Sequence, residues 1–452
     1  MAISAAAAKP KRRRMRMTAR RIRKAAKIRL KRKLRLRRLL RRAPSGSRRK
    51  PISLRARSAY RRKAYKRRAV RAKPAAEPEL APLPAGAGIN LVGFLRSEIG
   101  LGESMRLAAR SLSEAGVPFC MIDYKEQVSL GMGDTTWVHK ESEQPHYRVN
   151  VFHMNADAMP HIHRYFGHSL WHERYNIGVW HWELPEFPMQ FVDGFHFVQE
   201  LWAPSTYIQQ VMAKPGRVPV VYIPHGIHVD VDPALGRDYF GLPRDKFLFY
   251  VMYDAQSHTQ RKNPHGAIQA FASAFKRNDS RVGLVLKVNN RLAREEDFAP
   301  VAAMLEGRDN VYLIDRIMRR VEVNSLLQAT DCYVSLHRAE GFGLGLAEAM
   351  FLGKPVIGTN WSGNTDFMNG DNSCPVQYSL QPLGHDWAAY ESHQIWAEPD
   401  LEQAAAYMRE LVNNAQWRQR IAAVGQHTIR TRFSPYAAGR MMRQRLAQLG
   451  FA

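Results

Sequence analysis

The sequence predicts an α/β protein with two parallel-sheet domains that face each other across a cleft, behind a basic N-terminal tail that is disordered or helical. Three observations predict this arrangement. The chain has 452 residues, which is enough for two domains with substantial cores. From residue 89 onward, short apolar β-rich runs alternate with helical segments, which is typical of parallel sheets. The first 73 residues hold 33 of the 68 lysines and arginines and no acidic residue.

This tail, residues 1–73, accounts for the formal net charge of +28, because acidic residues slightly outnumber basic ones in the remainder. Three interpretations of it stay open. It is a solvated disordered arm, a surface helix attracted to anionic lipid, or a segment that binds nucleic acid. A Pro/Ala linker, residues 74–88, separates the tail from the folded part.

Cysteine usage and hydropathy indicate the compartment. The three cysteines, Cys120, Cys332 and Cys374, are far apart and odd in number, so no disulfide framework is expected. The N-terminus has no apolar stretch of signal-peptide length, and no run of about 18 apolar residues, long enough for a membrane span, occurs in the sequence. We therefore expect a cytoplasmic protein, peripheral to the inner face of the membrane if the tail binds lipid.

The first domain is expected over residues 89–240. It opens with a strand at 89–94, and a loop containing Gly100 and Gly102 precedes a helix at 105–112. A glycine loop between the first strand and the first helix points backbone amides into a cleft, although a tight turn would look the same.

A strand over 149–153 ends in His153, and Asn155 and Asp157 follow it. Ligands of open parallel sheets bind at the carboxyl ends of strands, so these three side chains are placed to face the cleft. The alternatives are a packed core histidine for His153 and helix N-caps for Asn155 and Asp157.

Seven histidines fall between residues 146 and 182, and His161 and His163 lie two apart. No carboxylate or cysteine cluster at ligand spacing accompanies them, so we interpret them as surface and packing residues and predict no metal site. The aromatic run 177–188 suits sugar stacking, but a core or interdomain role is the commoner one for such residues.

The second domain, expected over 241–432, opens with a buried strand at 247–254. The loop after it brings Arg261 and Lys262 to a helix that starts near Pro264. Fixed cations beside a helix N-terminus can hold a diphosphate and neutralise it as a leaving group. A lysine that is merely solvated at a helix start is the alternative.

The most informative stretch is 340–350, EGFGLGLAEAM, between apolar strands at 332–336 and 354–358. A strand, a glycine loop and a helix N-terminus together form an anion site, because glycine lets the backbone approach a ligand closely. Glu340 lies in the loop and Glu348 about two turns later in the helix. One carboxylate can thus face a sugar while the other faces a different part of the same ligand.

The longer stretch EGFGLGLAEAMFLGKPVIGTNWSGN, residues 340–364, resembles the glutamate–seven residues–glutamate signature of retaining, nucleotide-sugar-dependent glycosyltransferases of family 4, the glycosyl transferases group 1. That family has the GT-B fold, in which two Rossmann-like domains face each other across a cleft. The resemblance is strong over about 245–370, fair over 89–245 and absent from the tail. It also implies that a C-terminal helix, residues 433–452, returns to the first domain.

The resemblance implies a role for each candidate residue. Glu340, His153 and Lys262 would be catalytic, with Glu340 and His153 on the transferred sugar and Lys262 on the diphosphate. Donor binding would use Arg261, Lys262, Gly341, Phe342, Gly343, Leu344, Glu348, Gly100 and Gly102, and Asn155 and Asp157 would lie on the acceptor side. The family has an arginine a few residues before the lysine, whereas Tyr253 to Ser257 stand there in this chain. Arg261 therefore carries over less securely than Lys262.

The predicted function is transfer of a hexose such as mannose, with retention, from a nucleoside diphosphate sugar to a glycan or lipid-linked acceptor, in surface polysaccharide synthesis. No cofactor or metal is expected besides the nucleotide-sugar co-substrate, and the tail adds an anionic membrane surface as a partner. Two alternatives stay open. One is a nucleic-acid-binding protein with a non-catalytic GT-B body, and the other is a GT-B nucleotide-sugar epimerase or phosphorylase.

Overall fold

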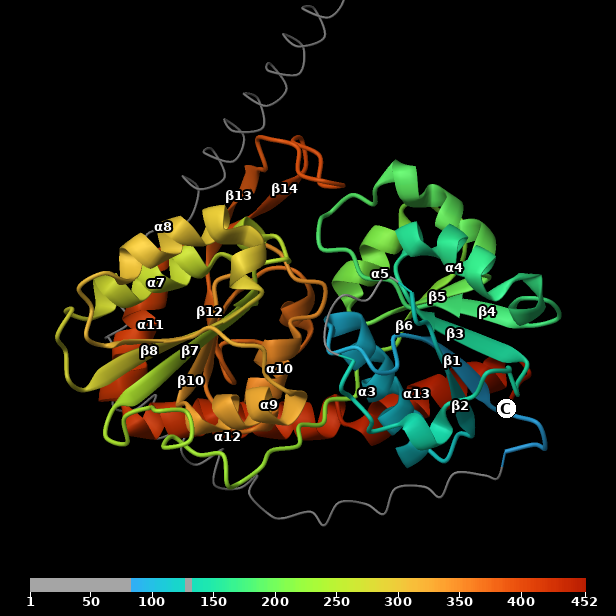
Figure 1. Cartoon of the computed structure of the whole chain (residues 1–452), viewed down its shortest axis with the longest axis horizontal. Helices are drawn as coiled ribbons and strands as arrows, with labels where there is room; N and C mark the ends of the chain where they lie inside the picture. Colours follow the sequence, from blue (N-terminus) through green and yellow to red (C-terminus); the bar gives the residue numbers. More distant parts are fainter. Residues whose placement is uncertain (1–82, 127–131) are drawn as a thin grey trace, which may run out of the picture. The chain divides into compact units, whose positions relative to one another are not determined.

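The computed structural model of the chain describes residues 83–126 and 132–452. The predicted tail, residues 1–73, and most of the linker lie outside the described residues. The described residues form one compact unit, which contains two six-stranded parallel sheets with helices around them (Figure 1). The predicted α/β architecture of two parallel-sheet domains is confirmed.

The sheet of the first domain has the strand order β2-β1-β3-β4-β5-β6 and every pairing in it is parallel. Its strands are β1 (Ile89–Gly93), β2 (Phe119–Asp123), β3 (Val149–His153), β4 (Tyr175–Gly178), β5 (Glu200–Ala203) and β6 (Val220–Tyr222). Strands β1 to β3 are buried throughout, which is why they read as continuous apolar runs rather than alternating ones.

The sheet of the second domain has the order β12-β11-β10-β7-β8-β9 and is also parallel. Its strands are β7 (Phe247–Asp254), β8 (Val282–Asn289), β9 (Val311–Ile314), β10 (Cys332–Ser335), β11 (Val356–Thr359) and β12 (Cys374–Val376). In both sheets the order reverses beside the first strand of the domain, and the carboxyl ends of strands at such a point are where ligands bind in open α/β sheets.

The helices cover these sheets. They are α3 (Gly100–Glu114), α4 (Met159–Phe166), α5 (Thr206–Ala213), α6 (Thr259–Lys262), α7 (Pro264–Ala274), α8 (Glu295–Leu305), α9 (Arg320–Ala329), α10 (Leu344–Phe351), α11 (Leu401–Asn413), α12 (Ala415–Arg432) and α13 (Pro435–Gln448). Short 3-10 helices are η1 (Val138–Lys140), η2 (Ala156–Ala158), η3 (His168–Leu170), η4 (Met189–Phe197), η5 (Arg291–Arg294) and η6 (Gly363–Asp366).

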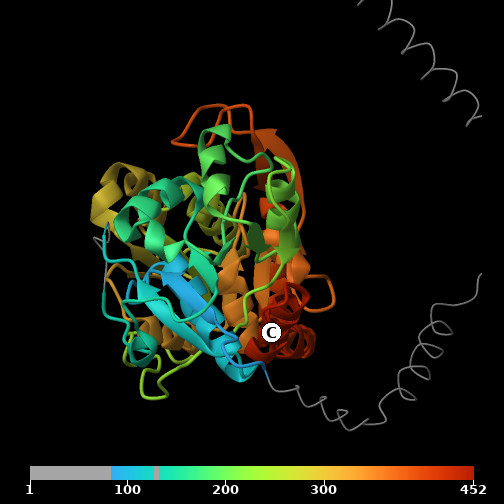
Figure 2. The same cartoon turned by 90° about the vertical axis from the view of Figure 1, so that its right-hand side faces the viewer.

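Helices α12 and α13 run beneath both domains at the bottom of Figure 1, and the turned view in Figure 2 shows these red helices nearly end-on. α12 packs against α10 of the second domain, whereas α13 packs against α3 of the first. Met442 and Leu446 of α13 belong to the same buried cluster as Ile89 and Leu91 of β1. The end of the chain therefore forms part of the core of the first domain.

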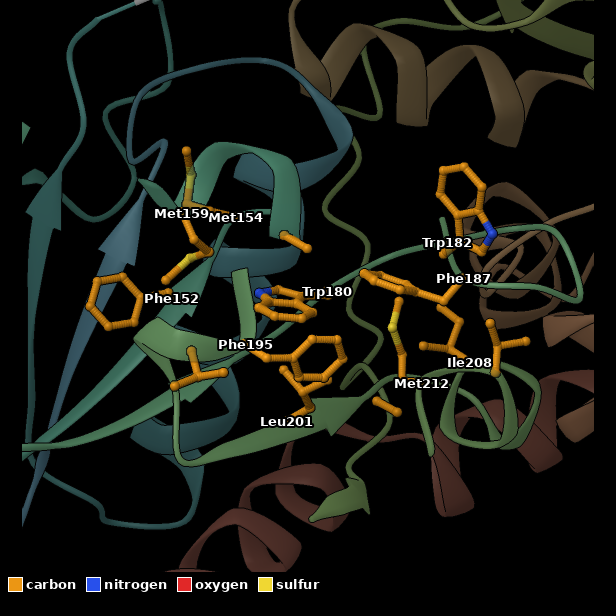
Figure 3. Packing of buried hydrophobic residues seen from close by; sticks show 14 of the residues in the cluster. Phe152, Met154, Met159, Trp180, Trp182, Phe187, Phe195, Leu201, Ile208 and Met212 are labelled. Atoms are coloured by element: carbon orange, nitrogen blue, oxygen red, sulfur yellow. The ribbon is translucent and has the colours of Figure 1, made fainter. Parts of the chain in front are cut away.

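An antiparallel hairpin, β13 (Tyr378–Pro382) and β14 (Ile395–Pro399), was not predicted from the sequence. Its residues Tyr390 and Trp396 belong to the first domain's hydrophobic core around Trp180 and Trp182, part of which Figure 3 shows. The aromatic run 177–188 thus packs in a core that reaches the hairpin. Neither Trp180 nor Trp182 lines the large cavity described below, so the packing interpretation fits and sugar stacking does not.

Two further observations concern the whole described part. The three cysteines are buried free thiols, which agrees with the prediction that they form no disulfide framework; they are Cys120, Cys332 and Cys374. Within residues 83–126 and 132–452, no helix is both long and apolar enough to cross a membrane.

Candidate functional site

A cavity of about 560 Å³ lies between the two domains. The first domain contributes Glu98 to Leu101, Asn155, His181, Glu183 and His225, among others. The second domain contributes Lys262, Arg320, Glu340, Gly341 to Leu346 and Glu348, among others. The cavity has the size of a site for a small organic ligand, and most of the predicted site residues meet there.

The loop 336–343 and the start of α10 form one wall of the cavity. Gly343 has φ +89° at the N-cap of α10, a conformation that glycine adopts readily. Gly363 lies so close to the loop that an added Cβ would be 2.0 Å from the Gly341 carbonyl oxygen. The Leu346 N–H already donates to the Gly343 carbonyl at 3.0 Å, but the N–H groups of Leu344 and Gly345 come before the first hydrogen bond of the helix. This wall therefore offers amide donors and a positive helix end to an anion.

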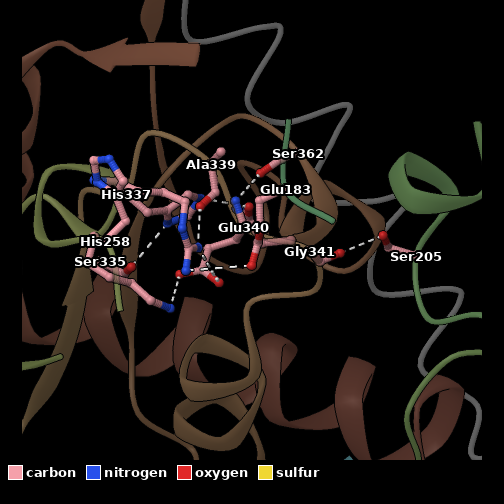
Figure 4. Close-up of polar contacts among 12 residues, drawn as sticks. Glu183, Ser205, His258, Ser335, His337, Ala339, Glu340, Gly341 and Ser362 are labelled. Carbon is pink, nitrogen blue, oxygen red and sulfur yellow. Dashed lines mark hydrogen bonds and ion pairs between the residues drawn. The ribbon is translucent and has the colours of Figure 1, made fainter. Parts of the chain in front are cut away.

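Glu340 lies in this loop and pairs with Lys262. Lys262 Nζ donates to Glu340 Oε1 at 2.5 Å. The Glu340 backbone N–H donates to Ser362 Oγ at 2.8 Å, and Figure 4 labels these two residues. Burial by itself would raise the pKa of Glu340, but Lys262 and Arg261 outweigh it and hold the pKa at about 2. Glu340 is therefore an anion at every working pH and faces the cavity beside a fixed cation.

Arg261 has a different position from the one expected for a donor ligand. It is buried and does not line the cavity. Its Nη1 donates to the Ala339 carbonyl at 3.0 Å, and its Nη2 lies 3.5 Å from Glu183 Oε1. α6 turns Arg261 and Lys262 to different sides, so Lys262 reaches the cavity while Arg261 is used within the protein.

Glu348 lies on α10 at the opposite end of the glycine stretch, and it is buried. Arg320, the first residue of α9, forms an ion pair with it, and Arg320 Nε lies 3.6 Å from Glu103 Oε1 of α3. Burial raises the pKa of Glu348 to about 7, with a further contribution from Glu103 and against the opposing effect of Arg320.

Arg320 was not predicted as a site residue. The signal was present in the sequence, because Arg320 follows β9, and residues after parallel strands gather at one edge of a sheet. Glu183 was not predicted either, although it follows β4 and has the same signal. It lies in the aromatic run 177–188, where only the aromatic residues were considered. Both side chains line the cavity.

The glycine loop predicted between the first strand and the first helix is helical instead. α3 begins at Gly100, five residues before the predicted start, and Gly100 lines the cavity while Gly102 does not. An added Cβ on Gly102 would lie 2.3 Å from the Ser97 carbonyl oxygen. Gly102 thus permits close packing of the turn, and Gly100 and Leu101 bring the N-terminus of a 15-residue helix to the cavity.

The structure brings His181 rather than His153 to the cavity. His153 is buried, and its Nδ1 lies 2.9 Å from Ser104 Oγ. His181 Nε2 lies 3.3 Å from His225 Nε2. Burial lowers the pKa of His153 to about 3 and that of His181 to about 4, so both rings are neutral at pH 7.

Asn155 and Asp157 separate as well. Asn155 lines the cavity, and its Oδ1 accepts the backbone N–H of His181 at 2.9 Å, which orients the histidine. Asp157, in η2, is exposed and does not line the cavity. In the part of the chain that the structure describes, no three His, Cys, Asp or Glu side chains are arranged to hold a metal ion.

Residues 244–382 match the family model of glycosyl transferases group 1, a range that contains Lys262, Glu340 and Glu348. No curated protein sequence matches the chain. Many solved structures share its fold, among them the following three. HepE of Anabaena, in complex with UDP and glucose, is 14% identical with a TM-score of 0.59, and the match covers 80% of this chain and 100% of HepE.

The sucrose-phosphate synthase of Thermosynechococcus elongatus is 14% identical with a TM-score of 0.56, over 80% of this chain and 99% of that one. A glycosyltransferase from Rickettsia africae is 13% identical with a TM-score of 0.55, over 80% and 98%. At these identities the likeness concerns the fold, which is GT-B.

Proposed function

We propose that this chain, which belongs to the glycosyl transferases group 1 through its second domain, is a retaining hexosyltransferase that uses a nucleoside diphosphate sugar. The observation that carries the proposal is the pairing of Lys262 with Glu340 at 2.5 Å, at the N-terminus of α10. A fixed cation, free helix amides and a permanent carboxylate there suit a ligand with a diphosphate at one end and sugar hydroxyls at the other.

The second domain would hold the donor. Lys262 and the amides of Gly341 to Leu344 would bind the diphosphate, and Glu348 would accept hydrogen bonds from the ribose hydroxyls. HepE was solved with UDP and with UDP-glucose in the same fold, which supports a nucleoside diphosphate donor. Which base and which hexose are bound would be decided by the residues around Met318 and Arg320 at the same cavity.

The reaction centre would lie between Glu340 and the first domain. The bond between the anomeric carbon and the diphosphate oxygen would break with its electron pair left on the diphosphate, where Lys262 and the helix amides stabilise the charge. The acceptor hydroxyl would bond to the same carbon, and its proton would pass to the departing phosphate. Glu340 would orient the sugar hydroxyls, and neutral His181 would contact the sugar in the role that the resemblance gave to His153.

The first-domain wall supports an acceptor whose reacting end is uncharged. Among the described first-domain residues that line the cavity, Arg106 is the only lysine or arginine, and its guanidinium is already used within the protein. Its Nη1 donates to the Leu95 and Ser97 carbonyls, Nη2 to Glu103, and Nε lies 3.1 Å from Asp134. A sugar hydroxyl of a glycan or a lipid-linked glycan fits such a wall better than a phosphate would. Surface polysaccharide synthesis at the cytoplasmic side of a membrane would use acceptors of this kind.

The test is product analysis with a labelled donor. The full chain would be incubated with UDP-glucose, GDP-mannose or ADP-glucose and a mixture of neutral oligosaccharides and polyprenyl-linked sugars. The expected result is a labelled α-linked product and free nucleoside diphosphate in equal amounts. An isomerised nucleotide sugar would support an epimerase, a sugar phosphate formed with inorganic phosphate would support a phosphorylase, and no turnover with any donor would contradict the proposal.

A further inference from the structure

Glu183 belongs to the first domain but contacts two groups of the second. It lies in the loop after β4, and Tyr390 Oη of the β13–β14 hairpin donates to Glu183 Oε2 at 2.8 Å. Arg261 Nη2 lies 3.5 Å from Glu183 Oε1. Tyr390 and Arg261 are both buried, so salt and water screen these contacts little. The carboxylate is thereby fixed by two partners from the other domain.

Arg261 connects this carboxylate to the loop that carries Glu340. Its Nη1 donates to the Ala339 carbonyl at 3.0 Å and lies 3.8 Å from Glu340 Oε2. The Arg338 backbone N–H in turn donates to the Arg261 carbonyl at 2.7 Å. The guanidinium thus lies between two carboxylates, one from each domain, and Figure 4 shows Glu183 and Glu340 lying close together.

A second contact from the first domain reaches the same loop. Ser205, at the N-cap of α5, donates from its Oγ to the Gly341 carbonyl at 2.6 Å. The backbone on each side of Glu340 is therefore tied, through Ala339 and Gly341, to groups that the first domain supplies or orients. Groups of both domains therefore hold the loop that carries Glu340.

We propose that Glu183, held by Tyr390 and acting through Arg261, is a positioning residue for Glu340. The inference rests on the proposed function in that Glu340 faces the transferred sugar. With Glu183 charged, Arg261 is shared between two anions and Lys262 remains the closer partner of Glu340. If the charge of Glu183 were removed, Glu340 would be the nearest carboxylate to a buried guanidinium, and attraction would draw it away from the cavity.

The variant Glu183→Gln tests this, with Glu186→Gln as the matched control. Glu186 lies in the same loop, and its carboxylate contacts His393 of the same hairpin, 3.2 Å away, instead of Arg261. The first measurement is hydrogen–deuterium exchange of the amides of residues 337–345 in the full chain without nucleotide. We expect exchange about tenfold faster in Glu183→Gln and unchanged in Glu186→Gln, because only the former loses the ion pair with Arg261, the residue that contacts the loop through the Ala339 carbonyl.

The second measurement compares kcat for sugar transfer with the Kd for UDP. Glu183→Gln should lower kcat about tenfold and leave Kd within about twofold, since the diphosphate ligands are untouched. Tyr390→Phe keeps every charge and removes only the hydrogen bond to Glu183. It should therefore speed the exchange and lower kcat by less than Glu183→Gln does, and it provides a second test if Glu183→Gln folds poorly.

Unchanged exchange in Glu183→Gln and Tyr390→Phe, or equal acceleration in the Glu186→Gln control, would overturn the inference. A weaker Kd with unchanged kcat would also overturn it, because Glu183 would then act on the donor directly. If the exchange difference is seen but the parent transfers no sugar, the proposed function fails while the role of Glu183 in placing Glu340 is supported.

Discussion

Donor binding should strengthen as the pH rises through 7, because of Glu348. In the protein without donor the pKa of Glu348 is about 7, raised by burial and by Glu103. Ribose hydroxyls donate hydrogen bonds best to the carboxylate form. Below pH 7 the donor must therefore displace a proton from Glu348, whereas above about pH 8 the carboxylate is already present.

The size of the effect follows from this pKa. If the donor binds only the ionised form, the apparent Kd exceeds its limiting value about elevenfold at pH 6 and about 1.1-fold at pH 8, so it falls about tenfold over this interval. The neighbouring groups do not titrate in it. The pKa of Glu340 is about 2 and that of His181 about 4, and the pKa of Arg320 is raised further from neutrality.

Isothermal titration calorimetry with UDP-glucose, whose diphosphate keeps its charge over this range, measures the effect. Titration at pH 6.0, 7.0 and 8.0 gives Kd, and titration at pH 6.5 in two buffers of different ionisation enthalpy gives the protons released. We expect about 0.8 proton per donor bound, the fraction of Glu348 that is protonated at pH 6.5. Glu348→Gln should bind at least tenfold more weakly at pH 8 and lose the pH dependence. A parent Kd that is flat or rises between pH 6 and 8 would refute the assignment of Glu348 to the ribose.

Three further outcomes are expected. Glu340→Gln should lower kcat at least tenfold and leave the UDP Kd within about threefold, because a hydrogen bond from a charged group is worth about 1.5–3 kcal/mol and this one acts on the reacting sugar; full turnover would contradict the role. Sugar transfer should persist in excess EDTA, because Lys262 and the α10 amides neutralise the leaving group; loss of activity that Mn²⁺ or Mg²⁺ restores would count against this. Deleting residues 1–73 should leave the UDP Kd unchanged while co-sedimentation with anionic vesicles falls sharply; a truncated protein that no longer binds UDP would argue against a separate arm.

The elements that could be predicted from the sequence are those whose signal is local. Continuous apolar runs predicted the buried strands of both sheets, because strands covered on both faces carry no polar alternation. The stretch 340–350 predicted the loop and helix that form one wall of the cavity, because glycine spacing, a helix N-terminus and two carboxylates occur within eleven residues. Lys262 was found in the same way, beside a helix start marked by Pro264.

The local sequence pattern did not show which of two residues of the same type would line the cavity. His153 ends one buried strand of the first sheet and His181 follows another, and nothing in the neighbouring sequence separates them. The structure turns His153 toward Ser104 and brings His181 to the cavity through Asn155. Gly100 and Gly102 similarly look like a loop, whereas the tight contact of Gly102 with Ser97 allows α3 to begin earlier.

The tertiary structure alone decided which charges meet. Arg261 and Lys262 are adjacent in the sequence, yet one is shared between Glu183 and Glu340 while the other faces the cavity. Arg320 pairs with Glu348, which lies 28 residues away. Ion pairs of this kind form between side chains whose separation along the chain carries no periodic signal. They are set by where the sheets end and how the two domains dock, and only the folded chain fixes both.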